Sequence, residues 1–450
     1  RCPTRLARTS GPEWLEQAMA VPTETALSAL APLVGAGVRP AVTADAVMGV
    51  RPAVVVEPAD EDEIAAVLAW AHRAGATVLV RGGGTQLGMG APPSAGDIVL
   101  SMARLSAQLE HAPHDQTTTV QAGMRLVDVQ AALAETNQWL ALDPVLRPEA
   151  TIGGVIATNA SGARRLRYGG VRDALIGIRV VLADGTIAKG GGKVVKNVAG
   201  YDLPKLFVGS LGTLGVIVAA TFRLYPLPAA SRTIVCASPD LAPLATLIAR
   251  VRASTLVPTS IDLARAEVSP GAELAIRFES GVAPAVDDQA ATVARLAGEC
   301  GLDVTQDLTG AEERRFWQAL DGALAAGAAD SAALTVKASL LPAQVVSWLD
   351  ELARFAAEAS VAARYRAHAG HGIVYARLSG TADALASAVD RLRAAASAGR
   401  GSLVVTDAPS ELAARLDVWG PVAALDVMRR IKERFDPSAT LNPGRFVGGL

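Results

Sequence analysis

Three glycine-rich segments hold the residues with the clearest potential for chemistry. The first, VRGGGTQLGMG (Val80–Gly90), follows the apolar stretch TVLV, which predicts a strand. Because its run of small residues places few side chains in the way, its backbone N–H groups can close around the phosphate oxygens of a pyrophosphate. Its spacing matches neither G-x-G-x-x-G nor GxxxxGK(S/T), and a glycine loop after a strand is often only a turn.

The second segment, RPEATIGGVIATNASGARRLRYGGVRD, runs from Arg147 to Asp173. Amides near Thr151 to Gly154 open a predicted helical turn and could hold anionic oxygens, while small residues at 160–162 would let a flat ring lie against the backbone. The third segment, KVVKNVAGYDLPKLFVGSLGTLGVI (Lys193–Ile217), leads through a short predicted helix into an apolar strand. Three such segments in one domain favour a shared binding surface over three separate turns.

Lysine is scarce in this chain. Only six of the 42 basic residues are lysine, and four of them lie between Lys189 and Lys205. Lys193 and Lys196 could stand where a compact ammonium is needed instead of a planar guanidinium. A coding bias toward arginine with chance clustering explains the pattern equally well, and both interpretations stay open.

From Ala53 onward the sequence predicts a strand, a helix and a second strand, and these elements would position the first segment. Asp60 can cap the helix and form a capping box with Glu63, and Gly75 suits its end. One apolar face is predicted, at Ile64, Val67, Leu68 and Ala71. Further strands are expected over Asp97–Ser101, Thr117–Gly123 and Ala174–Gly191, the last with Asp184-Gly185 as a hairpin turn.

The composition of the sequence changes after Leu224–Pro228, where glycine becomes sparser and predicted alanine-rich helices alternate with short predicted strands. We place a domain boundary at residue 228. Amphipathic helices are expected over 287–298, 311–326, 343–359 and 381–398, with a strand over Leu274–Ser280 and a last helix over about 421–435. Residues 1–50 are expected to form an N-terminal extension packed on the surface, with a helix around Trp14 to Met19.

Composition excludes several classes of protein. The 450 residues are 50% hydrophobic and 19% charged, which is typical of a globular chain. A net charge of -2 leaves no basic excess for nucleic acid, and apolar stretches such as Leu214–Phe222 are shorter than the roughly 18 residues of a membrane helix. Cys2, Cys236 and Cys300 lie too far apart for a CxxC motif or a four-cysteine iron–sulfur cluster, so we expect a reducing, cytoplasmic setting.

The order of these segments, followed by TLNPGRF near the C-terminus, resembles the PCMH-type flavin-binding domain of the vanillyl-alcohol oxidase superfamily. GGKVVKNVAGYDLPKLFVGSLGTLGV and FDPSATLNPGRF are similar to the FAD-binding subunits of bacterial glycolate oxidase, especially the smaller flavin subunit. The resemblance implies an α+β fold: an FAD-binding domain of two α+β subdomains (51–228), an α+β cap domain (229–425) and a C-terminal segment (426–450) that returns to the flavin site. It also implies two partners, a second flavin subunit and an iron–sulfur subunit.

The resemblance further implies which residues hold FAD. The candidates wrap the pyrophosphate, line the flavin or approach its ring: Gly82, Gly83, Gly84, Thr85, Gln86, Gly88, Met89, Pro148, Thr151, Gly153, Gly154, Thr158, Ser161, Gly162, Tyr168, Gly215, Val216, Ile217 and Asn442. Arg81 and Lys196 are further candidates. Members with a covalently linked flavin usually offer a histidine or cysteine near these loops, and this chain has neither there, so noncovalent FAD is expected.

The resemblance weakens in the second domain. Relatives that oxidise 2-hydroxy acids carry GHxGDGNxH, whose histidines help to bind a divalent metal, and a later E-H-G segment. The matching stretch here is AHAGHGIVY, in which His368 keeps the first position, His371 replaces the aspartate and Tyr375 replaces the second histidine. No E-H-G occurs in the chain. We therefore expect no metal site.

Three residues of this stretch are candidates for catalysis. His368 and His371 could transfer protons, because histidine titrates in the physiological range, or they could be remnants satisfied by local hydrogen bonds. Arg366 could hold a substrate carboxylate or have an ordinary structural role. For the remaining histidines, His72, His111 and His114, no role in the site is expected.

The function that the resemblance implies is an FAD-dependent oxidoreductase. Such a subunit serves the oxidation of a small 2-hydroxy acid, glycolate or D-lactate, to the 2-oxo acid, with electrons passing to the iron–sulfur partner. Two alternatives stay open: a self-sufficient D-2-hydroxy-acid dehydrogenase that uses His371 as the base, and a flavin subunit that only relays electrons or stabilises a complex. Any contact with a membrane would be made through a partner subunit.

Overall fold

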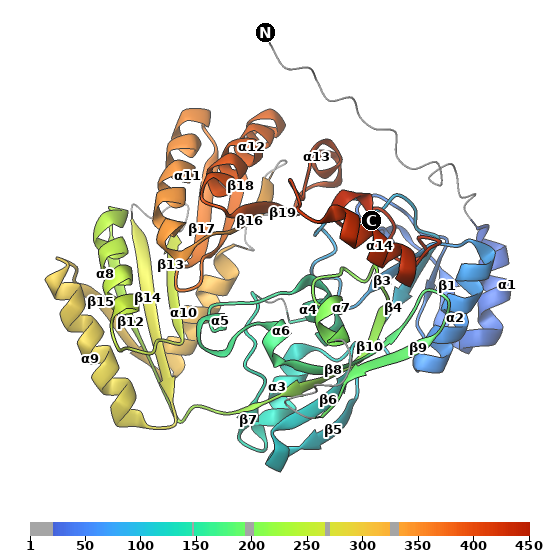
Figure 1. The fold of residues 1–450 in the computed structure, drawn as a ribbon, viewed down its shortest axis with the longest axis horizontal. Coiled ribbons are helices and arrows are strands. Elements are labelled where there is room, and N and C mark those ends of the chain that lie inside the picture. The colour runs from blue at the N-terminus through green and yellow to red at the C-terminus, as the bar shows by residue number, and fades with distance from the viewer. Residues whose placement is uncertain (1–20, 146–147, 194–201, 266–270, 325–332) are drawn as a thin grey trace, which may run out of the picture.

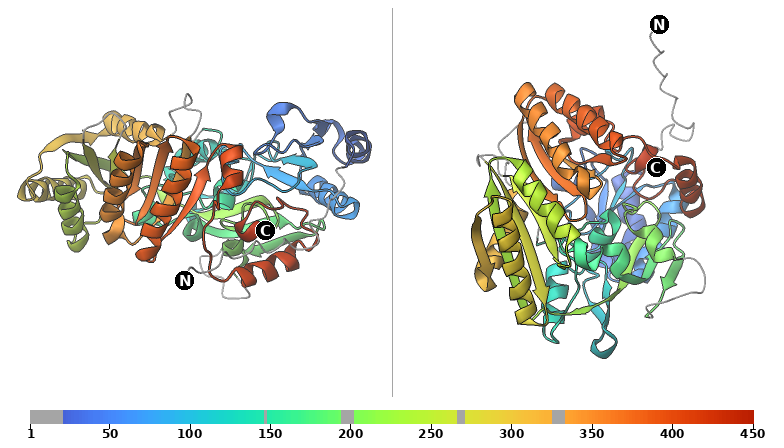
Figure 2. Two further views of the ribbon diagram at one scale, coloured as in Figure 1. Left: turned by 90° about the horizontal axis from the view of Figure 1, so that it is seen from above. Right: turned by 60° about the vertical axis from the view of Figure 1, so that its left-hand side comes forward.

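The computed structural model describes residues 21–145, 148–193, 202–265, 271–324 and 333–450. Two bodies lie side by side (Figure 1), and each is built around its own sheets. One contains residues up to about 228 together with the C-terminal tail, and the other contains an eight-stranded sheet with its helices (Figure 2). The expected helix around Trp14 to Met19 lies outside the described residues.

The predicted strand–helix–strand unit forms as expected. Helix α2 (Glu61–Ala74) joins β2 (Val54–Val56) to β3 (Val78–Arg81) and buries the four predicted apolar residues. Asp60 caps α2 by accepting from the Glu63 amide at 2.9 Å, and Gly75 ends it in the left-handed region with φ 65°. The Glu63 carboxylate accepts from the Ala59 amide at 2.6 Å, one residue before the partner that a capping box predicts.

Residues before 50 are part of this first layer. Helix α1 (Thr23–Val34) buries Ala26, Leu30 and Val34 in the main core, and β1 (Val38–Pro40) pairs antiparallel with β2. Both β2 and β3 pair in parallel with β4 (Ile98–Ser101), so the strand order is β1-β2-β4-β3. The expectation of a surface extension is therefore incorrect for residues 23–40, because β1 covers the edge of β2 that would otherwise be unpaired.

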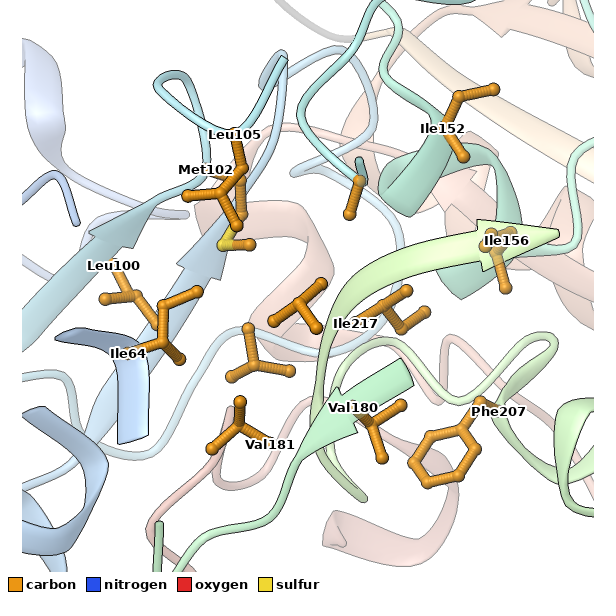
Figure 3. Packing of buried hydrophobic residues seen from close by; sticks show 14 of the residues in the cluster. Ile64, Leu100, Met102, Leu105, Ile152, Ile156, Val180, Val181, Phe207 and Ile217 are labelled. Carbon is orange, nitrogen blue, oxygen red and sulfur yellow. The ribbon is translucent and has the colours of Figure 1, made fainter. Parts of the chain in front are cut away.

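A five-stranded antiparallel sheet, of strand order β5-β6-β10-β8-β9, completes the first body. Its strands are β5 (Gln108–Ala112), β6 (Thr117–Gln121), β8 (Leu175–Val181), β9 (Ile187–Gly191) and β10 (Val216–Arg223), and β7 (Gln138–Trp139) pairs separately with β11 (Tyr225–Pro226). The helices are α3 (Leu126–Ala134), α4 (Ile152–Thr158), α5 (Arg165–Tyr168), α6 (Val171–Ala174) and α7 (Leu203–Phe207). Ile64, Leu100, Ile156, Val180 and Phe207 belong to one core shared by the two sheets (Figure 3).

The second body is built on an antiparallel sheet of order β15-β12-β14-β13-β17-β18-β16-β19. Its strands are β12 (Ala230–Ser238), β13 (Ser260–Arg265), β14 (Ala272–Ser280), β15 (Val304–Thr309), β16 (Ala333–Ser339), β17 (Ala362–His368), β18 (Ile373–Ser379) and β19 (Ser402–Asp407). The predicted helices appear as α9 (Ala283–Glu299), α10 (Gly310–Ala323), α11 (Val345–Ala359) and α12 (Ala382–Ala398), joined by α8 (Leu241–Ala253) and α13 (Ser410–Arg415). No helix among the described residues is long and apolar enough to cross a membrane.

Alternation along these strands separates a core face from a polar face. Val336 and Ala338 of β16 point into the core beneath α8, α9, α11 and α12, so Thr335 and Lys337 point to the opposite face. The same alternation on β18 buries Val374 and Ala376 in that core and directs Tyr375 and Arg377 to the polar face. The polar face of the second sheet is the one that meets the first body.

The C-terminal segment returns to the first body. Helix α14 (Leu425–Phe435) places Phe435 edge-on against Phe207, and Leu441 forms a parallel bridge with Val78 beside β3. Lys432 is buried and donates to Asp436 and to the carbonyl oxygens of Thr213 and Leu441. These contacts fix the tail on two of the glycine-rich segments.

Candidate functional site

A cavity of about 310 Å³ lies where the two bodies meet. Its first wall contains loop 82–89, α4 and the tail at Asn442 and Arg445, and its second wall contains residues of β16, β18, β19 and α10. A smaller cavity of about 70 Å³ continues from it between loop 82–89, α4 and the third glycine-rich segment. The elements that sequence analysis singled out therefore surround two adjoining cavities that share lining residues.

Glycine allows the first two segments to touch. A Cβ atom on Gly82 would collide with the Thr151 hydroxyl, and one on Gly83 would collide with the Glu149 carbonyl. Gly154 is different, because a Cβ there would meet only the Thr151 hydroxyl at 3.3 Å, and Gly154 lines both cavities. Gly82 and Gly83 thus bring the walls together, while Gly154 leaves room inside them.

The free backbone amides lie on the loop and not on the helix. The Ile152 and Gly153 amides donate to the Met124 and Ala122 carbonyls at 2.9 and 2.7 Å, and the Gly154 amide donates to the Thr151 hydroxyl at 3.4 Å. The expectation that these helix amides hold anionic oxygens is therefore incorrect for Ile152 and Gly153. Within the described chain, the amides of residues 82–85 donate to no protein group, so the loop retains the donors that a pyrophosphate needs.

The tail fastens the loop in place. Asn442, with φ 44°, accepts from the Val80 amide at 3.2 Å and donates to the Leu211 carbonyl at 3.0 Å. Arg445 donates to the Leu87 and Met89 carbonyls at 2.8 and 2.6 Å. Side chains of the C-terminal segment therefore hold the backbone on both sides of the glycine run.

Most of the predicted cofactor residues line the two cavities. Those that do so are Gly82, Gly83, Gly84, Thr85, Gln86, Gly88, Met89, Thr151, Gly153, Gly154, Thr158, Gly215, Ile217 and Asn442. The predicted residues that line neither cavity are Arg81, Pro148, Ser161, Gly162, Tyr168 and Val216. Lys196 lies outside the described residues.

Several of the predicted residues that lie outside the cavities have other contacts. Arg81 donates to Asp45 at 3.1 Å, and Tyr168 packs edge-on against Trp139 and Tyr225 with ring centroids 5.3 and 5.0 Å apart. Val216 is buried in β10, opposite Val181 of β8. Lys193, whose ammonium was a candidate for a functional role, is exposed and pairs with Glu110.

The catalytic candidates lie behind the cavity wall. His368 is fully buried, with Nδ1 at 3.0 Å from Asp262, and Arg366 pairs with Asp262 at 2.7 Å and with Asp321. His371 donates to the Gly162 carbonyl at 3.3 Å, and burial lowers the pKa of its imidazole to about 4, with His368 adding to the effect. None of these three residues lines the cavity, whereas Asp321 does.

These contacts correct the expected role of Arg366. Its guanidinium is 3% exposed and is already engaged by two carboxylates, so it supports the wall instead of holding a substrate. Each histidine makes one local hydrogen bond, His368 to Asp262 and His371 to Gly162 of the first body, whereas His368 Nε2 and His371 Nδ1 are buried without a partner among the described residues. Both interpretations of the two histidines therefore stay open. Among the described residues no cluster of three or more histidine, cysteine or acidic side chains could hold a metal ion.

The cap wall presents residues that sequence analysis did not assign to the site. Lys337 and Tyr375 are opposite each other on β16 and β18, with the ammonium 5.9 Å from the ring centroid. Arg377 lies 3.4 Å from the Thr335 hydroxyl and 3.7 Å from Asp407. Lysine scarcity could have pointed to Lys337, since Lys337 and Lys432 are the two lysines outside 189–205 and Lys337 occupies a polar position in the alternation of β16.

Comparison with known families names the domains that form the first wall of the cavity. Residues 52–191 match the model of an FAD binding domain, and residues 418–446 match that of the C-terminal domain of FAD linked oxidases. The chain therefore contains an FAD binding domain and the C-terminal domain of FAD linked oxidases. FAD is its cofactor, and the predicted fold class, with a PCMH-type FAD-binding domain, is confirmed.

Relatives of this chain include proteins that are named as enzymes of 2-hydroxy acids. It is 36% identical to glycolate oxidase subunit GlcD of Bacillus subtilis over 47% of this chain and 45% of that protein. It is 39% identical to D-2-hydroxyglutarate dehydrogenase of Xanthomonas citri pv. viticola over 45% of this chain and 43% of that protein. The matches therefore span less than half of the length of both relatives. An uncharacterized FAD-linked oxidoreductase of Mycobacterium tuberculosis is 28% identical over 88% of this chain and 91% of its own.

Solved structures share the fold. An alkyldihydroxyacetonephosphate synthase superposes with a TM-score of 0.69 at 18% identity, covering 88% of this chain and 78% of the synthase chain. The cavity also fits the cofactor chemically, because it combines unpaired loop amides for a pyrophosphate with a lining of small and apolar residues for a ring system. FAD, when bound there, supplies a two-electron acceptor.

Proposed function

We propose that this chain oxidises a small 2-hydroxy acid to the 2-oxo acid with noncovalently bound FAD. The observation that carries the proposal is one cavity in which the phosphate-binding loop faces cationic residues of the cap, Lys337 and Arg377. A cofactor on the loop side leaves a polar, positively charged wall for a small anion on the cap side. The names of the relatives, glycolate oxidase subunit and D-2-hydroxyglutarate dehydrogenase, support the same substrate class.

The chain's own groups have separable tasks in this proposal. Amides of loop 82–85 hold the pyrophosphate, and Asn442 and Arg445 keep that loop rigid. Tyr375, whose pKa is raised to about 12 by burial, stays a neutral phenol at the substrate side of the cavity. The cap sheet excludes water and orients the substrate. No histidine or cysteine lines either cavity among the described residues, which supports noncovalent binding.

Partners belong to the same proposal. A relative that is a glycolate oxidase subunit supports assembly with a second flavin subunit and an iron–sulfur subunit, to which electrons would pass. The assignment to the smaller flavin subunit and the cytoplasmic setting remain predictions. A flavin subunit that only relays electrons is a second candidate, favoured by the position of His368 and His371 behind the cavity wall.

The test is anaerobic reduction of the FAD-loaded chain. Glycolate, D-lactate and D-2-hydroxyglutarate are added separately, and the flavin band near 450 nm (an approximate value for any flavin) is followed. We expect bleaching by at least one of them and none by ethylene glycol, in which an uncharged hydroxymethyl group replaces the carboxylate of glycolate. A band that persists with every acid contradicts the proposal and favours the relay function.

A further inference from the structure

We propose that the Lys337 ammonium receives the substrate carboxylate and thereby selects 2-hydroxy acids over uncharged alcohols. The inference rests on the proposed function and names the recognition group of that site. It assigns a binding role to a residue that neither the flavin-binding motif nor the histidine stretch contains.

The position of Lys337 makes it available to a ligand. It lies on β16, at the centre of a polar patch with its strand neighbour Tyr375, and it lines the cavity opposite loop 82–89. Within the described chain its ammonium has no hydrogen bond and no acidic partner, although the residue is half-buried. A charge that is partly withdrawn from solvent is normally paired, so the missing partner points to an anion that enters the cavity.

Lys432 shows the contacts of a lysine with a structural role. It is buried, and its ammonium bonds to Asp436 and to two backbone carbonyls. All of its donors therefore have acceptors within the fold, whereas Lys337 has only a ring face at 5.9 Å. The contrast separates a lysine that holds the fold together from one that is open to a ligand.

The charges around the cavity favour the same assignment. The two carboxylates that line it are each matched by an arginine, Asp321 by Arg366 and Asp407 by Arg377 at 3.7 Å. The Lys337 charge is left over on the cap side, and Arg165 adds to the positive potential there. A monoanion balances this excess, whereas a neutral alcohol leaves it unbalanced.

The experiment compares four FAD-loaded proteins: wild type, Lys337→Met, Lys337→Arg and the control Lys189→Met, which removes an exposed ammonium from β9. Pyruvate, the 2-oxo product of D-lactate, is titrated into each oxidised protein and the perturbation of the flavin spectrum gives the Kd. Lactamide, an uncharged analogue of lactate, is titrated in parallel. Turnover with D-lactate and glycolate then gives KM and kcat.

We expect Lys337→Met to raise the pyruvate Kd at least tenfold and the D-lactate KM similarly, with lactamide binding unchanged. Lys337→Arg should restore most of the affinity, and Lys189→Met should match wild type. A pyruvate Kd within twofold of wild type in Lys337→Met, or in Lys337→Gln if the first variant does not fold, overturns the inference. If no 2-hydroxy acid reduces wild type but Lys337→Met still has a raised pyruvate Kd, the carboxylate site stands and the proposed function is overturned.

Discussion

At the scale of single residues, Lys337 is unusual because its position lowers stability. Burial lowers the pKa of its ammonium from 10.5 to about 8, with a smaller contribution from Arg165. The unfolded chain therefore binds more protons than the folded chain between about pH 8 and 10.5, so this residue makes stability rise with pH across that window. A lysine that lowers the stability of the fold in this way is better explained by a role in ligand binding than by a role in folding.

Two matched substitutions should change stability in opposite directions. Lys337→Met should stabilise the ligand-free protein at pH 7 by up to about 3 kcal/mol, and the gain should vanish as the pH approaches 10.5. Lys432→Met should destabilise it by about 3–5 kcal/mol, because Asp436 would stay buried without its cation. Urea unfolding at pH 7 and 10 measures both changes, and a loss of stability in Lys337→Met would show that its ammonium has a structural partner.

Carboxylate binding should depend on the same proton. The other charged or titratable groups around the cavity are Arg165, Asp321, Tyr375, Arg377, Asp407 and Arg445. Because the Lys337 pKa is about 8, the pyruvate affinity of wild type should fall about tenfold per pH unit above pH 8. Titrations from pH 7 to 10 should show this fall in wild type and a nearly flat profile in Lys337→Arg, and a fall of equal size in both would assign the proton to another group.

At the scale of elements, the site depends on the contact between loop 82–89 and α4. Gly83→Ala would drive a methyl group into the Glu149 carbonyl and displace the loop whose amides face the cavity. We expect this variant to be purified without FAD and to bind little FAD when the cofactor is added. Gly298→Ala in α9 is the control, since a Cβ there has no neighbour within 4 Å, and it should bind FAD as wild type does.

Local sequence predicted these elements well and their mutual contacts poorly. Asp60, Gly75 and the apolar spacing of α2 predict that helix because caps and periodicity act within a few residues. The amides of α4 could not be assigned from their own segment, because their acceptors, Met124 and Ala122, follow β6 about thirty residues earlier. The pairing of β1 with β2 was missed for the same reason, since three residues carry too short a pattern.

At the scale of the whole molecule, the cavity exists only while the two bodies stay docked. Arg164 of the first body forms a forked pair with Glu279 of β14, at 2.6 Å, and stacks 4.8 Å from the Trp139 ring. Burial opposes ionisation of Glu279, but the positive charge of Arg164 outweighs it and lowers the pKa of the carboxyl group. This pair therefore joins the domains through a carboxylate with a side-chain exposure of 2%.

Breaking that pair should loosen the interface. Arg164→Met should destabilise the protein by about 3 kcal/mol, because the Glu279 carboxylate would remain buried without its main partner. Arg415→Met, which removes a partner of the exposed Asp383, should change stability by less than about 1 kcal/mol. Thermal unfolding of both variants checks the contrast, and equal Tm values would show that the Arg164 pair does not hold the domains together.

Occupation of this cavity by FAD is the central claim, and the absorbance spectrum of the purified chain tests it most directly. After addition of FAD and gel filtration, we predict close to one flavin per chain, released into the supernatant on acid precipitation because no covalent bond holds it. Retention of the flavin on the precipitated protein would contradict noncovalent binding. A chain that retains no flavin after reconstitution would contradict the whole account of the site.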